Sequence, residues 1–77
     1  MKAGQVYQNK QTGEQVVIFS VRKYTAAEYR REVRGMDNGR RVVYYPIEFV
    51  GKRRLPVEHC EEYRFADWFE LVAQGVA

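Results

Sequence analysis

His59 and Cys60 stand side by side and are the two side chains best suited to nucleophilic or metal chemistry. Each type occurs once, so a thiolate would lack a second histidine as its base, and a zinc site would lack most of its usual four ligands. Neighbouring side chains of a strand also point to opposite faces, which keeps the pair from acting together. We therefore expect Cys60 to be a small core residue, and we predict a non-enzymatic protein that uses no metal and no cofactor.

The stretch EYRREVRGMDNGRRVVYY, residues 28–45, concentrates arginine around an Asp-Asn-Gly turn signal. Residues 22–54 carry ten basic against four acidic side chains, a charge of +6, whereas residues 55–77 carry −4. A basic middle suits the phosphates of DNA or RNA, and an aromatic ring beside it suits stacking on a base. The same concentration of arginine suits a solvated hairpin equally well, because exposed arginines pair with glutamates across strands and discourage aggregation at sheet edges.

If Asn38 and Gly39 form a two-residue turn, the side chains of this hairpin alternate between a core face and an outward face. The core face then receives Val42 and Tyr44. The outward face receives Arg30, Arg34, Arg41 and Tyr45, and the next turn can extend this surface with Lys52, Arg53 and Arg54. Together they form the predicted nucleic-acid-binding surface, with Glu32 among them as a neutralising carboxylate.

Short strands must hold these side chains in place. GQVYQN (4–9) and EQVVIFSVRK (14–23) flank the KQTG turn, and their β-branched and aromatic residues predict an N-terminal hairpin. The strand that begins at Arg40 meets Pro46, which predicts a sheet edge, a bend or a bulge there. A turn and a last strand near residues 54–59 follow.

The segment before Arg40 is open to two interpretations. Thr25 precedes Glu28 by three residues, which is the spacing of a capping box and allows a helix at 26–34. The turn signal instead requires an upstream partner strand, and REVRGM (31–36) is the adjacent candidate. We favour the strand, because an Asn-Gly turn has a direct backbone reason to form, whereas so short a helix is marginal by itself.

The closing FADWFELVA places Phe65, Trp68, Phe69 and Val72 on one helical face, so we expect a short C-terminal helix that plugs the sheet. About five short strands and this helix predict a mainly β fold, a small curved barrel of Src-homology-3-like or Tudor-like type. An antiparallel meander of α+β class with the helix at 26–34 is the alternative. In either case residues 1–77 form a single small domain.

Aromatic side chains are more numerous than a core of this size hides. The aromatic residues in question are Tyr44, Tyr45, Phe49, Phe65, Trp68 and Phe69. Some of these six can line a groove for a peptide or a homodimer interface. Before any bulge at Pro46, Ile47 and Phe49 fall on the outward register, and they are the predicted protein-interface residues. Glu58, Glu61 and Glu62 are open to two interpretations, weak binding of a cation or a solvated acidic turn, and we expect the solvated turn.

The opening KAGQVYxxxxTGEQVVIxxV, the later Cys60 and the closing FADWFELV resemble short accessory proteins of lambda-type enterobacterial phages and prophages. The resemblance covers both ends of the chain, while residues 23–40 look like an expansion. It implies an intracellular phage setting, in which binding a host protein or nucleic acid is a common task.

We therefore expect a binding module in the cytoplasm, that of the host cell if the chain is phage-encoded. Its expected partner is DNA or RNA, a host protein, or a second copy in a homodimer. A membrane is not expected as a partner, because the longest apolar run, VVIF (16–19), is far below the roughly 20 residues of a membrane span. The lone cysteine suits a reducing compartment.

Overall fold

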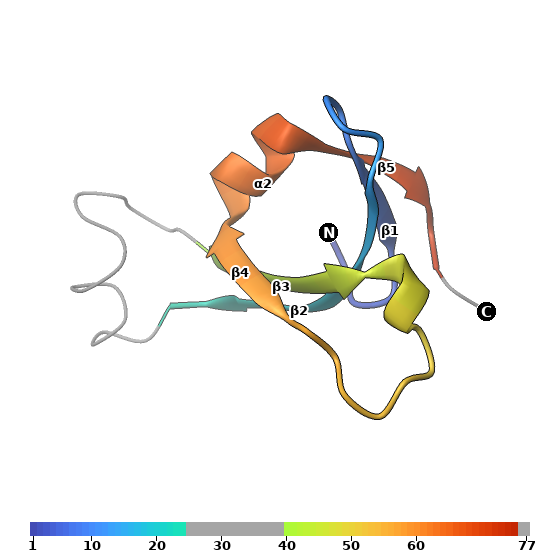
Figure 1. Cartoon of the computed structure of the whole chain (residues 1–77). Coiled ribbons are helices and arrows are strands. Elements are labelled where there is room, and N and C mark those ends of the chain that lie inside the picture. The colour runs from blue at the N-terminus through green and yellow to red at the C-terminus, as the bar shows by residue number, and fades with distance from the viewer. Residues whose placement is uncertain (25–39, 76–77) are drawn as a thin grey trace.

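Five antiparallel strands form one sheet in the order β4-β3-β2-β1-β5 in the computed structural model, which describes residues 1–24 and 40–75. The elements are β1 (Val6–Asn9), β2 (Gln15–Lys23), β3 (Arg40–Pro46), the 3-10 turn η1 (Ile47–Phe49), β4 (Glu58–Glu61), α2 (Glu62–Trp68) and β5 (Phe69–Ala73). Figure 1 shows the sheet curving around a central core, with α2 lying across its open side between the edge strands β4 and β5.

The N-terminal hairpin is confirmed. β1 pairs with β2 from Val6 opposite Val17 to Gln8 opposite Gln15. The turn between them uses Gly13 with φ of 77°, a left-handed conformation that glycine adopts without steric cost. The side-chain oxygen of Asn9 accepts the backbone N–H groups of Gln11 (2.8 Å) and Thr12 (3.0 Å), which fixes this turn locally.

The neighbours of β3 differ from those predicted. One edge of β3 pairs with β2, from Lys23 opposite Arg40 to Val16 opposite Pro46, and the other edge pairs with β4. The predicted pairing with residues 32–37 is therefore wrong, because β2 and β4 already occupy both edges of β3. The Asn38-Gly39 turn and the alternative helix at 26–34 lie outside the described residues.

Proline at position 46 ends β3 instead of placing it at a sheet edge. The pairing with β4 covers Arg41 to Tyr44 only, so Pro46 lies where β3 has a single neighbour, as its missing N–H requires. The chain then bends into η1, which confirms the predicted bend. The following strand occupies 58–61 instead of 54–59, after Pro56.

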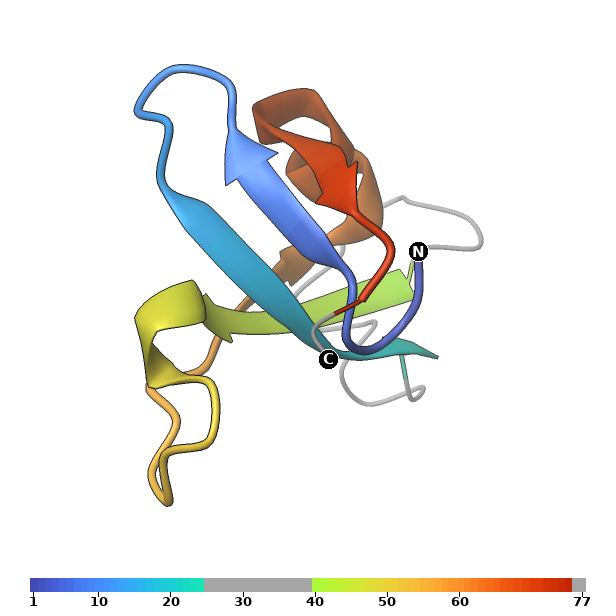
Figure 2. The same ribbon diagram turned by 90° about the vertical axis from the view of Figure 1, so that its right-hand side faces the viewer.

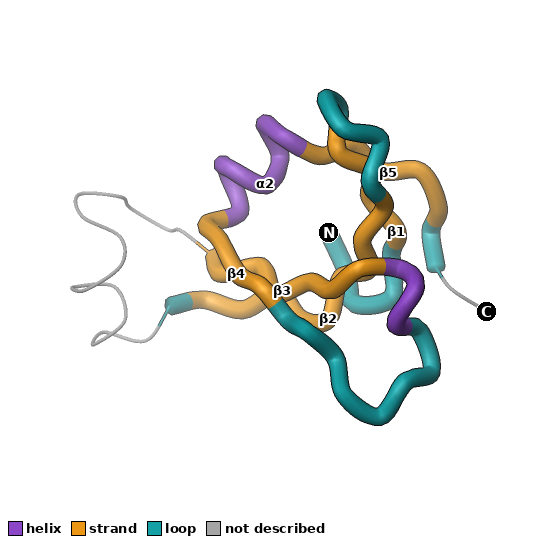
Figure 3. Tube along the Cα trace, viewed as in Figure 1, coloured by secondary structure: helices purple, strands orange, loops and turns teal. Residues whose placement is uncertain are grey.

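The predicted C-terminal helix is only half right. The helix covers 62–68, and residues 69–73 form strand β5, which pairs with β1 from Asn9 opposite Phe69 to Val6 opposite Ala73. Figure 3 shows this change from helix to strand directly after Trp68. The free edge of β1 offers backbone partners to the last segment, and strand pairing there outweighs its helical periodicity.

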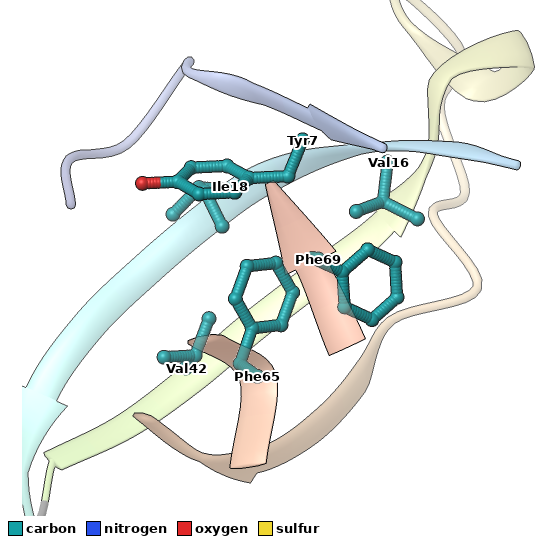
Figure 4. Close-up of a cluster of buried hydrophobic side chains, with 6 residues drawn as sticks. All are labelled: Tyr7, Val16, Ile18, Val42, Phe65 and Phe69. Carbon is teal, nitrogen blue, oxygen red and sulfur yellow. The ribbon is translucent and has the colours of Figure 1, made fainter. Parts of the chain in front are cut away.

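Aromatic rings from the sheet and the helix form the centre of the core. The buried cluster consists of Tyr7, Val16, Ile18, Val42, Phe65 and Phe69 (Figure 4). Phe65 stacks on Phe69 with ring centroids 4.4 Å apart and meets Tyr7 edge-on at 5.1 Å. In β3, Val42 is fully buried and Tyr44 packs on the cluster, which confirms the predicted core face of that strand.

The fold class is the predicted one: mainly β, a small barrel-like five-stranded antiparallel sheet with one short helix. The sheet stays unclosed, since β4 and β5 each have a single neighbour in the strand order, and α2 fills the gap. Within residues 1–24 and 40–75, no helix has the length and apolar character needed to cross a membrane.

Candidate functional site

Two hollows that share Asn9 and Trp68 in their linings lie at one end of the sheet. The first, termed here the mouth hollow, has a volume of about 220 Å³ and is lined by Asn9, Glu14, Val16, Tyr44, Pro46, Glu58, Trp68 and Phe69. The second, of about 420 Å³, is lined by Asn9, Lys10, Gln11, Asp67 and Trp68. The Trp68 side chain is 50% exposed, so its ring is available at the rim of both.

Strand register brings the lining of the mouth hollow together. Opposed residues of an antiparallel pair share a face, so Tyr44 and Glu58 project together from β3 and β4. In the same way Asn9 and Phe69 share a face of β1 and β5. Glu14 stands one residue before β2 and two before the buried Val16. The hollow thus collects residues far apart in the sequence.

Backbone contacts hold Trp68 against the first turn. The N–H of Lys10 donates to the carbonyl of Trp68 at 2.9 Å, and the ammonium of Lys10 donates to the carbonyl of Ala66 at 3.3 Å. The helix ends here because Phe69 is extended, with φ of −126° and ψ of 149°. The backbone of Trp68 is therefore fixed at the junction between α2, β5 and the turn at 10–14. Figure 2 shows α2, β5 and this turn at the same end of the sheet.

The phenol of Tyr44 indicates the electrostatic character of the mouth hollow. Burial raises the pKa of Tyr44 to about 12, and the thiol of Cys60 and the carboxylates of Glu58 and Glu14 add to this rise. Both carboxylates therefore act on the same hydroxyl, and Glu58 also forms a side-chain hydrogen bond with it. Of the residues that the structure describes, no lysine or arginine lines this hollow.

The arginines at the start of β3 and in α2 lie close to carboxylates. Arg40 makes a two-pronged hydrogen bond and ion pair with Glu62 at the start of α2. Arg64 pairs with Glu61 at 3.1 Å. Arg41 is half-buried and lies opposite Glu61 on β4. These acidic neighbours reduce the positive potential that a phosphate backbone would meet at this end of the sheet.

The remaining residues of the predicted nucleic-acid surface lie apart from one another. Three exposed basic residues lie in the loop after η1: Lys52, Arg53 and Arg54. This loop follows the end of β3 that is opposite to Arg40, and β3 itself is about 20 Å long at the usual rise per residue. Tyr45 is half-buried and packs edge-on against Phe19, with centroids 6.4 Å apart. Arg30 and Arg34 lie outside the described residues. The structure therefore does not join the two basic groups that it describes into one patch.

The predicted protein-interface residues both lie in η1. Ile47 is exposed and Phe49 is half-buried, and neither lines the hollows described above. Their assignment to an interface stays a prediction.

His59 and Cys60 point to different surroundings on β4. His59 is exposed, whereas Cys60 is half-buried against the core cluster, which confirms that Cys60 is a packing residue. Burial and the charge of Glu61 raise the pKa of Cys60 to about 11, so its thiol is protonated at neutral pH. In the part of the chain that the structure covers, no group of three histidine, cysteine or acidic side chains could hold a metal ion.

Fold and site together define a small antiparallel β module with an aromatic and acidic hollow at one end. The chain matches no protein-family model, no curated protein and no solved structure. The resemblance to phage accessory proteins therefore stays a prediction.

Sequence reasoning found the aromatic half of the hollow but missed its acidic half. Tyr44, Trp68 and Phe69 were expected among residues that could line a groove. Glu14 had no signal of its own, and Glu58 was read as part of a solvated turn. Only the pairing of β3 with β4 and the turn at 10–14 brings the two carboxylates to one place.

Proposed function

We propose that this chain is a non-enzymatic protein-interaction module that binds a peptide segment of its partner around Trp68. The observation that carries the proposal is the half-exposed Trp68 at the rim of two adjoining hollows. Single exposed apolar residues are common on protein surfaces, but a fixed tryptophan beside a concave surface has the properties of a binding hot spot. The protonated thiol of Cys60 supports the non-enzymatic part of the proposal.

Selection of a displayed random-peptide library on the immobilised protein tests this function. Peptides that bind the native chain are expected to lose at least tenfold in affinity on Trp68→Ala, since a hot-spot residue contributes about 2 kcal/mol or more. Phe19→Ala is the matched control, because Phe19 is an aromatic side chain of similar exposure, 53%, that lines neither hollow. Peptides that bind both variants equally well, or a selection that enriches none, would contradict the proposal.

Nucleic-acid binding is the second candidate, and three consecutive exposed basic side chains favour it: Lys52, Arg53 and Arg54. Binding of a labelled 20-nucleotide strand is expected to weaken steeply with salt, with each phosphate contact adding about 0.7 to the slope of log affinity against log salt. Changing all three residues to glutamine is expected to lower that slope by about two. Fluorescence anisotropy between 25 and about 200 mM salt measures it. No retention of DNA or RNA at the lowest salt would rule this candidate out.

A further inference from the structure

We infer that the mouth hollow receives a cationic side chain of the partner polypeptide, the ammonium of a lysine or the guanidinium of an arginine. This inference rests on the proposed protein-interaction function and names the chemistry that would be recognised there. It follows from the kinds of side chain that surround the hollow, from their charge and from the size of the space.

Aromatic rings form one part of the wall. Tyr44, Trp68 and Phe69 come from β3, α2 and β5, and Tyr44 and Phe69 hold each other at a centroid distance of 5.6 Å and 55°. The Phe69 ring is further held by its stacking on Phe65. Faces of aromatic rings attract cations through their quadrupole, and they do so most strongly where water is partly excluded.

Carboxylates form the other part of the wall. Among the described residues, Glu14 and Glu58 are the two carboxylates of the lining, and no described lysine or arginine lines the hollow beside them. The nearest lysine along the chain, Lys10, lines the adjoining hollow, and its ammonium is held by the carbonyl of Ala66. Both glutamates also raise the pKa of the Tyr44 phenol, Glu58 by its charge and a side-chain hydrogen bond and Glu14 by its charge. A positive group of the partner would complete this arrangement.

Size and charge disfavour drug-sized ligands, anions and purely apolar groups. The volume of about 220 Å³ lies below the roughly 300–1,000 Å³ of sites for drug-sized ligands and suits the end of one side chain. An anion would be repelled by the two carboxylates. A purely apolar group would take water away from two exposed carboxylates without supplying a positive charge, which is unfavourable. A long side chain with an apolar stem and a charged head satisfies both halves of the wall.

Intrinsic fluorescence gives a direct test, because Trp68 is the only tryptophan of the chain. Titration with N-acetyl-arginine amide or N-acetyl-lysine amide is expected to change the emission saturably, with a dissociation constant in the millimolar range typical of a single weak contact. N-acetyl-citrulline amide has nearly the same shape as the arginine probe without its charge, and we expect it to bind at least tenfold more weakly. Equal responses to the arginine and citrulline probes would overturn the inference.

Variants locate the effect in the mouth hollow. The double change Glu14→Gln and Glu58→Gln keeps side-chain shape and is expected to weaken the arginine probe at least tenfold. Glu70→Gln removes an exposed carboxylate of β5 outside the hollow and is expected to change nothing. Far-UV circular dichroism of each variant verifies that the fold is intact. An unchanged affinity in a folded double variant would overturn the inference.

The inference and the proposed function can fail separately. If selected peptides depend on Trp68 but contain no lysine or arginine and tolerate the double glutamine change, the cation site is wrong and the interaction function stands. If the arginine probe binds through Glu14 and Glu58 while no peptide is enriched, the site stands and the interaction function is wrong.

Discussion

Replacing Phe65 by alanine is expected to destabilise this domain by about 3–5 kcal/mol, the usual loss for a buried phenylalanine. The Phe65 side chain has 0% exposure and contacts three other rings, those of Tyr7, Tyr44 and Phe69. Domains of this size often have total stabilities near the lower end of about 5–15 kcal/mol, so the variant should be largely unfolded at moderate temperature. Urea denaturation followed by far-UV circular dichroism and Trp68 emission measures the loss.

Phe19→Ala provides the control for this experiment. Phe19 is 53% exposed and makes its aromatic contact with Tyr45 at the longer centroid distance of 6.4 Å. Its removal is expected to cost less than about 1 kcal/mol, since little apolar area leaves a packed environment. Similar losses for the two variants would show that the stability of the domain does not depend on the ring cluster around α2.

A chain that ends at Trp68 is expected to lose the cooperative fold altogether. It keeps the helix but lacks β5, so β1 loses the partner that pairs with it from Val6 to Asn9. It also lacks Phe69, which stacks on Phe65 with the two ring planes 10° apart. The loss of a strand and of a core ring together leaves backbone groups unpaired and the core open. Disappearance of the thermal transition in circular dichroism would report this outcome.

A chain that ends at Gln74 is the matched control for the shorter chain. It keeps the whole of β5 together with the side-chain hydrogen bond from Gln5 to Gln74, which measures 3.0 Å. We expect it to melt close to the full-length protein. A cooperative transition in the chain that ends at Trp68 would contradict the role assigned here to β5.

The two function candidates make opposite demands on charge. The cationic side chain inferred for the mouth hollow needs carboxylates that no basic group neutralises, and among the described residues no basic side chain lines the hollow. Nucleic-acid binding needs basic groups without acidic neighbours, yet Arg40 and Arg64 are engaged by Glu62 and Glu61. The basic loop at 52–54 is exposed, and within the described part of the chain no ion pair joins it to a carboxylate, which favours the second candidate.

Local patterns in the sequence were reliable where one segment decides its own structure. The β-branched run of β2 and the glycine turn before it determine the first hairpin, because both signals act within a few residues. Alternation along β3 correctly placed Val42 and Tyr44 in the core, since a two-residue period needs no knowledge of the partner strand.

The predictions were wrong where pairing with a strand remote in sequence determines the structure of a segment. FADWFELVA has helical spacing at Phe65, Trp68 and Phe69, but the free edge of β1 draws its second half into a strand. The Asn-Gly signal suggested a neighbour for β3 close in sequence, whereas β2 and β4 occupy both of its edges. In both cases backbone hydrogen bonds to a strand remote in sequence outweigh local periodicity.

The sequence by itself therefore determined the β class, the first hairpin, the aromatic supply of the core and the absence of a recognisable catalytic motif. The tertiary structure alone decided that Glu14, Tyr44, Glu58 and Trp68 line one hollow. The physical reason is that strand register, and not spacing along the chain, sets which side chains share a face. Two carboxylates that are 44 positions apart in the sequence become neighbours only when β3 pairs with β4 and the turn at 10–14 docks on the end of α2.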